Sequence, residues 1–248
     1  MSHLFEMPAQ VGGPILGSPH LILRRARQML CYLGHRLPGR DRAVVRRYLA
    51  QSETKKLHIG CGKNVLPGWL NMDALPLLPD VLYFDAARRF FFQDEAFDYI
   101  FSEHMIEHIS YHHSLNMLAE CQRVLKPLGK IRISTPDLNF LVNLYRDDKS
   151  ELHQRYVKWS ARAFSTGTVP EDNAVFVINH FVRNWGHRFI YDEKTLREAM
   201  LNTGFTNLVK CDLQESEDPA LCNLENEARL PLAFLRLETL TLEGTKPA

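Results

Sequence analysis

The 248-residue sequence lacks several features that define whole classes of protein. It contains no run of about 18 consecutive apolar residues, so we expect no membrane span. Its five cysteines are odd in number and form no C-x-x-C pair, which indicates free thiols in a reducing compartment rather than a disulfide framework. Glycine and proline supply only 13 residues each, and 45% of the chain is hydrophobic. This composition excludes collagen-like and disordered chains and predicts one or two folded domains.

The sequence also has almost no net charge, with 30 Lys and Arg against 29 Asp and Glu. The two ends of the chain nevertheless differ. Residues 1–50 carry eight Arg and two acids, whereas residues 212–248 carry eight acids and three basic residues. The 161 residues between them balance at 19 and 19. The basic end is therefore a local feature that needs its own explanation.

The basic segment has apolar residues at helical spacing over residues 21–37, which predicts an amphipathic helix, and a second short helix is predicted over 41–51. Such a helix can lie on an anionic membrane surface, so peripheral contact with the inner face of a membrane through residues 20–47 is one hypothesis. Packing on the domain, or binding a partner chain, are the alternatives. We expect no nucleic-acid binding, because the basic run lacks interleaved aromatics. The first residues do not have the pattern of a secretory signal, so a cytoplasmic location is expected.

After residue 55, short apolar runs alternate with helical stretches. This βαβ rhythm predicts an α/β fold with a mostly parallel sheet and helices on both faces. The seven candidate strands are 57–59, 69–72, 81–84, 97–101, 130–134, 205–211 and 232–242. The clearest helices are 115–125 and 193–202, and residues 137–164 are predicted to be largely helical. Residues 165–190 show no sustained period, which favours an insertion or lid.

The most informative segment is the turn after the first candidate strand, Gly60-Cys61-Gly62. In open α/β sheets, ligands bind at the carboxyl ends of the strands, and glycines there let a ligand approach the backbone closely. The second strand ends at Asp73, where an acid can accept hydrogen bonds from ribose hydroxyls. Asp85 follows the third strand, and the fourth ends at 102–104. The sequence therefore predicts a ligand site at this edge of the sheet.

Five phrases in the sequence, correctly spaced over about residues 55–213, resemble the class I S-adenosylmethionine-dependent methyltransferases. They are LHIGCG, LPGWLNMD, FDYIFSEHMIEH, RVLKPLGKIRISTPD and HRFIYDEKTLREAMLNTGF. The resemblance implies a Rossmann-like domain over residues 51–248, with an insertion or cap at about 137–190 and residues 1–50 as an extension. It also implies S-adenosyl-L-methionine as the cofactor. We expect transfer of a methyl group to a small-molecule or glycan-precursor acceptor; the sequence gives no oligomeric state.

Carried over to this sequence, the resemblance implies a set of cofactor-binding residues. Gly60 and Gly62 would border the methionine end, Asp73 would hold the ribose, and Asp85 would lie near the adenine. The full expected set is Gly60, Cys61, Gly62, Asp73, Ala74, Asp85, Ser102, Glu103 and His104. The sequence departs from the family at two positions: His58 stands where an acid is frequent, and Asn64 where a third glycine is frequent. These departures favour the alternative of a non-catalytic binding module with the same fold.

Histidine is the side chain best suited to act as a base near neutral pH, and an acceptor hydroxyl or ammonium group must lose a proton. The candidate catalytic residues are His104, His108 and His180. Residues of the unpatterned segment are candidates for substrate contact or lid closure: His180, Asn184, Trp185, His187 and Tyr191. The alternative, that this segment is an ordinary packed crossover, remains open.

The same region contains His104-Met-Ile-Glu107-His108, which matches the H-x-x-E-H motif of one class of zinc peptidases. On a helix, the two histidines would share a face, as zinc ligands require. A metallopeptidase is therefore a further, less favoured alternative. We assign no metal ligand in the predicted methyltransferase site. Assistance to methyl transfer by a metal ion is a separate hypothesis.

Overall fold

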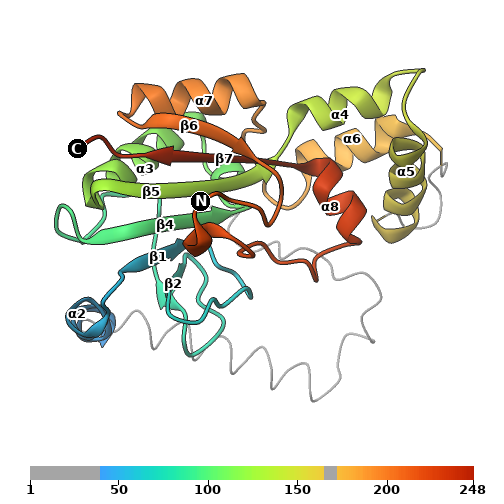
Figure 1. Cartoon of the computed structure of the whole chain (residues 1–248). Coiled ribbons are helices and arrows are strands. Elements are labelled where there is room, and N and C mark those ends of the chain that lie inside the picture. Colours follow the sequence, from blue (N-terminus) through green and yellow to red (C-terminus); the bar gives the residue numbers. More distant parts are fainter. Residues whose placement is uncertain (1–39, 165–171) are drawn as a thin grey trace, which may run out of the picture.

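The computed structural model describes residues 40–164 and 172–248 (Figure 1). The helix predicted over residues 21–37 lies outside the described residues. The strands are β1 (Lys56–Ile59), β2 (Leu70–Asp73), β3 (Leu82–Tyr83), β4 (Phe97–Glu103), β5 (Leu125–Pro136), β6 (Thr206–Cys211) and β7 (Thr239–Thr245). The helices are α2 (Arg40–Gln51), α3 (Tyr111–Val124), α4 (Leu138–Tyr145), α5 (Glu151–Phe164), α6 (Ala174–Arg183), α7 (Glu193–Asn202) and α8 (Leu232–Glu238), with 3₁₀ turns η1 (Ile106–His108) and η2 (Pro219–Leu221).

The seven strands form one sheet in the order β3-β2-β1-β4-β5-β7-β6. Strands β1 to β5 pair in parallel, and β7 runs antiparallel to both β5 and β6. The prediction of a mostly parallel, Rossmann-like sheet with seven strands and helices on both faces is confirmed. The strand order reverses between β1 and β4, and this is where a ligand is expected in such sheets.

One face of the sheet is apolar and lies under α3 and α7. Helix α3 is capped by Ser110, whose side chain accepts a hydrogen bond from the His113 backbone N–H. Its residues Met117, Leu118 and Cys121 recur at helical spacing and are fully buried. They meet the apolar side chains that alternate along the central strands, so the helix stays on the sheet through its buried stripe.

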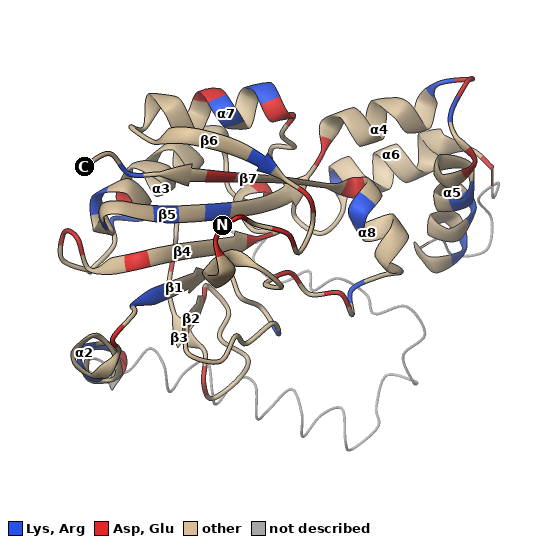
Figure 2. Cartoon of the chain, viewed as in Figure 1, with Lys and Arg blue, Asp and Glu red and all other residues tan. Residues whose placement is uncertain are grey.

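The other face of the sheet is covered by the chain around η2, which packs on Trp69 and Phe101 through Leu221 and Leu224. A fully buried Arg132 on β5 lies under this segment. It pairs with Glu243 of β7, the residue opposite it in the strand register. Figure 2 shows basic positions along β5 and acidic colour on the neighbouring β7. An internal ion pair therefore holds the C-terminal part of the chain against the sheet.

Beyond the carboxyl end of β5, helices α4, α5, α6 and α8 form a helical cap with a hydrophobic cluster of its own (Figure 1). The cluster is built around Phe140, Tyr156, Phe181 and Phe234, all of them buried. The cap therefore stands at the edge of the sheet where a ligand is expected. The division of the chain at residue 50 and the limits of a cap at 137–190 stay predictions. No helix among the described residues is long and apolar enough to cross a membrane.

Two predictions of secondary structure were wrong in part. The segment 165–190 contains helix α6, which was missed because its buried residues Ala174, Val177 and Phe181 extend over only about two turns. The strand predicted over 232–242 begins as helix α8 and becomes a strand only from Thr239. Phe234 belongs to the hydrophobic cluster of the cap and Leu237 packs against it, whereas Leu240 and Leu242 lie in the main core. The apolar run therefore contributes to two layers of the structure.

Candidate active site

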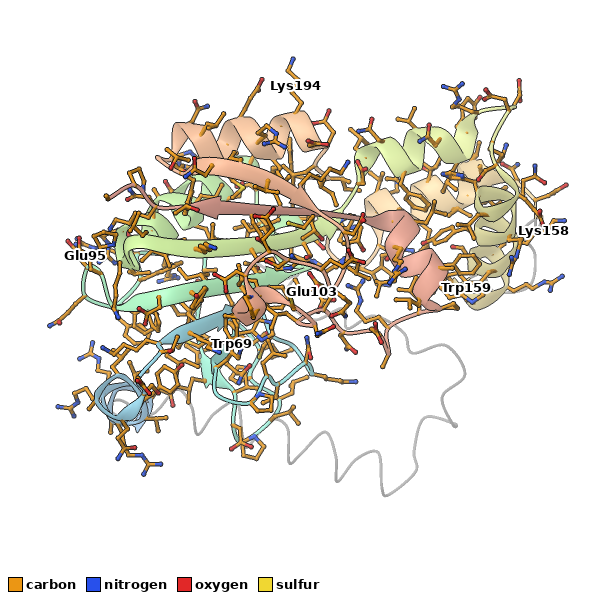
Figure 3. All side chains as sticks on the ribbon, viewed as in Figure 1. Trp69, Glu95, Glu103, Lys158, Trp159 and Lys194 are labelled. Atoms are coloured by element: carbon orange, nitrogen blue, oxygen red, sulfur yellow. The ribbon has the colours of Figure 1, made fainter. Side chains whose placement is uncertain are left out.

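A cleft of about 450 Å³ opens at the carboxyl end of the sheet, between the ends of β1 and β4 and the helical cap. In Figure 3, Glu103 at the end of β4 and Trp159 on α5 mark its two sides. The sheet side of the lining is made by Gly60, Cys61, Gly62, Lys63, Asn64, Glu103, His104, Glu107, His108 and Pro136. The other side is made by Tyr156, Trp159, Phe164, Phe181, Trp185, His187, Asn226, Arg229, Leu230 and Glu238.

The turn after β1 is shaped by its glycines. Gly60 and Gly62 have φ angles of 71° and 52°, in the left-handed region that L side chains rarely adopt. A Cβ on Gly60 would overlap the side chain of Met105, so the turn packs directly on the chain after β4. The Gly62 N–H donates to the Asp73 carboxylate over 2.9 Å, which ties the turn to the end of β2. The turn is therefore preorganised by two neighbouring strands.

Glu103 is a buried carboxylate that joins three parts of the chain. It accepts hydrogen bonds from the Asn226 backbone N–H at 3.0 and 3.1 Å and from the Asn64 side-chain amide at 3.3 Å. The Arg229 guanidinium lies 3.6 Å from it. Burial raises the pKa of Glu103, and the Arg229 charge opposes this rise. The carboxylate thus holds the segment 224–229 over the open end of the cleft.

Glu107 lies deeper and is fully buried on η1. Its Oε2 accepts a hydrogen bond from the Thr135 hydroxyl at 3.0 Å, while Oε1 has no hydrogen-bond partner among the described residues. Burial raises the pKa of Glu107 to about 7. A buried carboxylate oxygen without a donor is costly to maintain, so this atom needs a proton or a cation.

The two histidines of the H-x-x-E-H motif do not share a helix face, and that expectation was wrong. His104 has a left-handed φ of 46°, and only the 3₁₀ turn η1 follows it. The His104 Nδ1 accepts from the Arg229 guanidinium at 3.1 Å, and its Nε2 lies 3.3 Å from the Thr239 hydroxyl. Burial, together with the Arg229 charge, lowers the pKa of His104 well below its usual value. Both ring nitrogens of His104 are therefore occupied.

His108 lies at the cleft wall with its Nε2 3.9 Å from Glu107 Oε1. Its ring stands 4.9 Å, centroid to centroid, from the ring of His187. Burial lowers the pKa of both histidines, that of His187 to about 4. Both imidazoles are thus neutral at pH 7 and can accept a proton or offer a lone pair.

The cap side of the cleft is a wall of aromatic rings. Four rings follow one another along this wall, with 5.2 to 5.4 Å between the centroids of neighbours. In order they are Trp159, Phe164, Trp185 and Phe181. Below them, the Tyr156 hydroxyl donates to the buried Glu238 carboxylate at 2.5 Å. Burial raises the pKa of Glu238 to about 7. This wall combines apolar surface with a few fixed polar atoms, as small-molecule sites do.

The structure brings part of the predicted site together. The predicted residues that line the cleft are Gly60, Cys61, Gly62, Glu103, His104 and His108, joined by Trp185 and His187 from the unpatterned segment. The predicted residues that do not line it are Asp73, Ala74, Asp85, Ser102 and His180. Their proposed roles, and those of the lining residues, stay predictions.

The residues outside the lining have other visible tasks. Asp73 fixes the glycine turn and the Leu75 backbone N–H, and a carboxylate keeps acceptor capacity beyond those two bonds. Asp85 accepts from the Ala87 backbone N–H and pairs with exposed Arg88. Ser102 is fully buried within the sheet.

His180 and the remaining candidates of the unpatterned segment are arranged around the aromatic wall. His180 stacks on Phe164 at 5.2 Å and meets Trp185 at 4.6 Å, so it supports the wall from behind. Asn184 is exposed at the end of α6, and Tyr191 is fully buried in the main core. Of this group, only Trp185 and His187 lie in the lining.

The two departures from the family pattern do not remove the cleft. His58 is fully buried on the face opposite α3, where Nδ1 lies 3.1 Å from Asn71 Oδ1 and the ring packs on Phe101. Asn64 has a negative φ, so its position does not need a glycine. Its amide instead donates to the Leu224 carbonyl at 2.9 Å and so secures the segment that covers the cleft.

Several lining residues were missed from the sequence. In the sequence, Glu107 stands out only as part of the peptidase-like motif. Its position next to the candidate His108 is the signal that could have identified it as a lining residue. Arg229 and Glu238 belong to an acidic C-terminal stretch with no recognisable pattern, and they reach His104 and Tyr156 only through the fold. Trp159 stands one helical turn from Tyr156, a spacing equally typical of a buried core.

The residues at the glycine turn fit S-adenosyl-L-methionine. A Cβ placed on Gly62 would meet no atom within 4 Å, so the backbone there is open toward the cleft. The volume of the cleft falls in the range of roughly 300–1,000 Å³ found for small-molecule sites. Gly60, Cys61 and Gly62 are the residues that would border the cofactor.

Comparison with known proteins gives one family and several similar structures. The family model described as "Methyltransferase domain" matches residues 27–210. A SAM-dependent methyltransferase from Archaeoglobus fulgidus is 14% identical, with 92% of this chain and 100% of that chain covered and a TM-score of 0.48. A Thermotoga maritima SAM-dependent methyltransferase, described as a possible histamine N-methyltransferase, is 17% identical, with 92% and 97% covered and a TM-score of 0.44.

Phosphoethanolamine N-methyltransferase 2 of Haemonchus contortus, in complex with S-adenosyl-L-methionine, is 16% identical. It covers 85% of this chain and 53% of its own, with a TM-score of 0.45. Comparison with curated proteins gives no match. The family match extends over most of the chain and includes the glycine turn, strands β1 to β5 and helices α4 to α6 of the cap. The chain therefore belongs to the class I S-adenosyl-L-methionine-dependent methyltransferase family, whose methyl donor is S-adenosyl-L-methionine.

Proposed function

We propose that this protein transfers the methyl group of S-adenosyl-L-methionine to a small-molecule or glycan-precursor acceptor bound in the cleft. One observation carries the proposal: the glycine turn of the family and an aromatic wall face each other across a single cavity of about 450 Å³. One side offers open backbone for the cofactor, and the other offers rings and fixed polar atoms for an acceptor.

The cofactor supplies an activated methyl group on a sulfonium: a lone pair of the acceptor forms the new bond to carbon while the carbon–sulfur pair leaves with sulfur. The protein's own task is to align the two reactants and to exclude water. The turn at 60–62 fixes one reactant. Trp159 and Trp185 offer flat apolar surface for the other, and the segment 224–229, held by Glu103, closes the cleft from the side.

The acceptor's proton leaves toward the polar wall formed by Glu107 and His108. His104 is less suited to take it, because its ring nitrogens face Arg229 and Thr239. His108 is neutral and partly exposed to the cleft, with 36% of its side chain accessible. His180 acts by supporting Phe164 and Trp185.

Cofactor binding is tested by titrating S-adenosylhomocysteine into the full chain, by calorimetry and by thermal shift. A ligand that binds only the native state raises the free energy of unfolding by about 2.7 kcal/mol at a hundredfold excess over its dissociation constant. Absence of any heat or shift at millimolar ligand contradicts the proposal and supports a non-catalytic binding module instead.

Methyl transfer is tested next by screening hydroxylated and amine metabolites with wild type and two variants. His108→Ala and His180→Ala are expected to lower turnover more than they weaken S-adenosylhomocysteine binding. Unchanged turnover in both variants would remove these histidines from the mechanism.

A further inference from the structure

We propose that Glu107, His108 and His187 form a binding site for a divalent transition-metal ion of the Zn²⁺ type, with an open coordination position toward the cleft. One ligand atom of each residue lies within 4.8 Å of the other two. The metal site itself is independent of the proposed function; only the role given to the ion below rests on that function.

The distances are close to those that a bound ion requires. With metal–ligand bonds of about 2.1 Å in a tetrahedral arrangement, neighbouring ligand atoms are separated by roughly 3.4 Å. Glu107 Oε1 and His108 Nε2 are 3.9 Å apart. An ion therefore requires these two atoms to move about 0.5 Å closer together, and His108, with 36% of its side chain exposed, is less confined than the fully buried Glu107.

The carboxylate oxygen in the cluster needs a cation or a proton, because no group of the described residues donates a hydrogen bond to it. Glu107 is fully buried, its Oε2 is held by Thr135, and its Oε1 has no hydrogen-bond partner among the described residues. His104 Nδ1 is 3.5 Å from this oxygen but accepts a hydrogen bond from Arg229, so it carries no proton to donate. The oxygen is therefore a free ligand atom, oriented by its Thr135 partner.

His187 is oriented as a metal ligand is. The His187 Nδ1–H donates to the Phe181 carbonyl at 2.7 Å, which leaves Nε2 with a free lone pair. The Glu107 carbonyl accepts from the backbone N–H groups of Arg188 and Phe189 at 2.7 and 3.2 Å. These bonds fix the loop that carries His187 directly beside Glu107, although the two residues are 80 positions apart in the chain.

The chemistry of the donors selects the ion. Two imidazole nitrogens and one carboxylate oxygen suit Zn²⁺ and similar transition metals, whereas Mg²⁺ prefers oxygen ligands. Three protein ligands leave a fourth position open, as in catalytic zinc sites. With an ion bound, an acceptor oxygen at that position would have a lowered pKa, and its proton would leave to water instead of to Glu107 or His108. His108 would then act as a ligand of the ion and not as a free base.

The test is a titration of metal-free full-length protein with Zn²⁺ by calorimetry, and with Co²⁺ by visible absorption. We expect one equivalent to bind, with a tetrahedral Co²⁺ spectrum and a raised Tm. Glu107→Gln, which keeps the side-chain shape, and His187→Ala should each weaken Zn²⁺ binding at least 100-fold. His112→Ala, an exposed histidine on α3, should bind as wild type does.

Failure of wild type to bind Zn²⁺ at tens of micromolar, or equal binding by wild type and Glu107→Gln, overturns the inference. S-adenosylhomocysteine binding by each variant reports that its cleft is still folded. If His187→Ala does not fold, Glu107→Gln alone tests the metal site. Protein that binds S-adenosylhomocysteine but no Zn²⁺ refutes the metal site alone. Protein that binds Zn²⁺ but not S-adenosylhomocysteine refutes the proposed function and leaves the metal site standing.

Discussion

Replacement of Arg132 by methionine should destabilise the fold more than any surface change. The Arg132 side chain is fully buried and pairs with Glu225 and Glu243, each at 2.6 Å. It also donates to the carbonyls of Glu215 and Asp212 at 2.8 and 3.2 Å. Methionine fills much of the same volume but leaves two carboxylates unpaired in the interior.

The expected loss is about 3–5 kcal/mol, the range measured when one partner of a buried ion pair is removed. For a chain of this size, each kcal/mol lowers the Tm by about 2–4 °C, so the melting temperature should fall by at least about 6 °C. Urea unfolding and calorimetry measure both quantities. S-adenosylhomocysteine binding should weaken as well, because Glu225 precedes Asn226, whose N–H is bonded to Glu103.

Arg146→Met is the matched control, since Arg146 forms an exposed pair with Asp148 and its loss should have no measurable effect. The double variant Arg132→Met/Glu225→Gln should recover part of the loss, because one of the two unpaired charges is then gone. A loss below about 1 kcal/mol in Arg132→Met would refute the reasoning that buried charge holds this segment.

Three further predictions follow from other parts of the structure. Burial lowers the pKa of His58 to about 4, so as the pH falls the unfolded chain takes up a proton before the folded chain does. The free energy of unfolding should therefore fall by up to about 3 kcal/mol between pH 7 and pH 4, and urea unfolding of His58→Gln should show a smaller fall. Gly60→Ala should lower the Tm more than Gly62→Ala, because only the first methyl group overlaps Met105, and similar losses would contradict the packing argument. Trp159→Ala should raise the KM for an acceptor with little change in S-adenosylhomocysteine affinity. If acceptor binding and S-adenosylhomocysteine binding are both lost, Trp159 supports the fold and not the acceptor site.

The parts of the fold that the sequence predicted are those with local signals. Short apolar runs predicted the central strands, a helical stretch ended by a glycine predicted α7, and two glycines marked the turn after β1. Helix α8 was missed because a run of leucines fits a strand or a helix equally well, and the choice depends on which layer it meets. The contact of the basic segment 20–47 with a membrane stays a prediction, since most of it lies outside the described residues.

The cleft was harder to predict because its polar atoms come from distant parts of the chain. The bonds from Asn226 to Glu103 and from Arg229 to His104 span 123 and 125 positions. No spacing rule reaches that far. His187 is similar: its ring is brought to Glu107 by backbone bonds at Arg188, which a side-chain motif does not encode.

The departures at positions 58 and 64 show how a family pattern can change while its turn persists. His58 lies near the Asn71 amide, which also bonds the backbone of Leu66 and Trp69, so the position supports the chain that leads into β2. Asn64 gives up the freedom of glycine but gains bonds to Glu103 and to the segment covering the cleft. Neither side chain obstructs the backbone at Gly62, where a cofactor would approach. Asn64 therefore helps to build the cleft, whereas His58 supports the sheet beside it. A structural task for each residue explains why the fold keeps it, and the S-adenosylhomocysteine titration decides between the methyltransferase and the non-catalytic module.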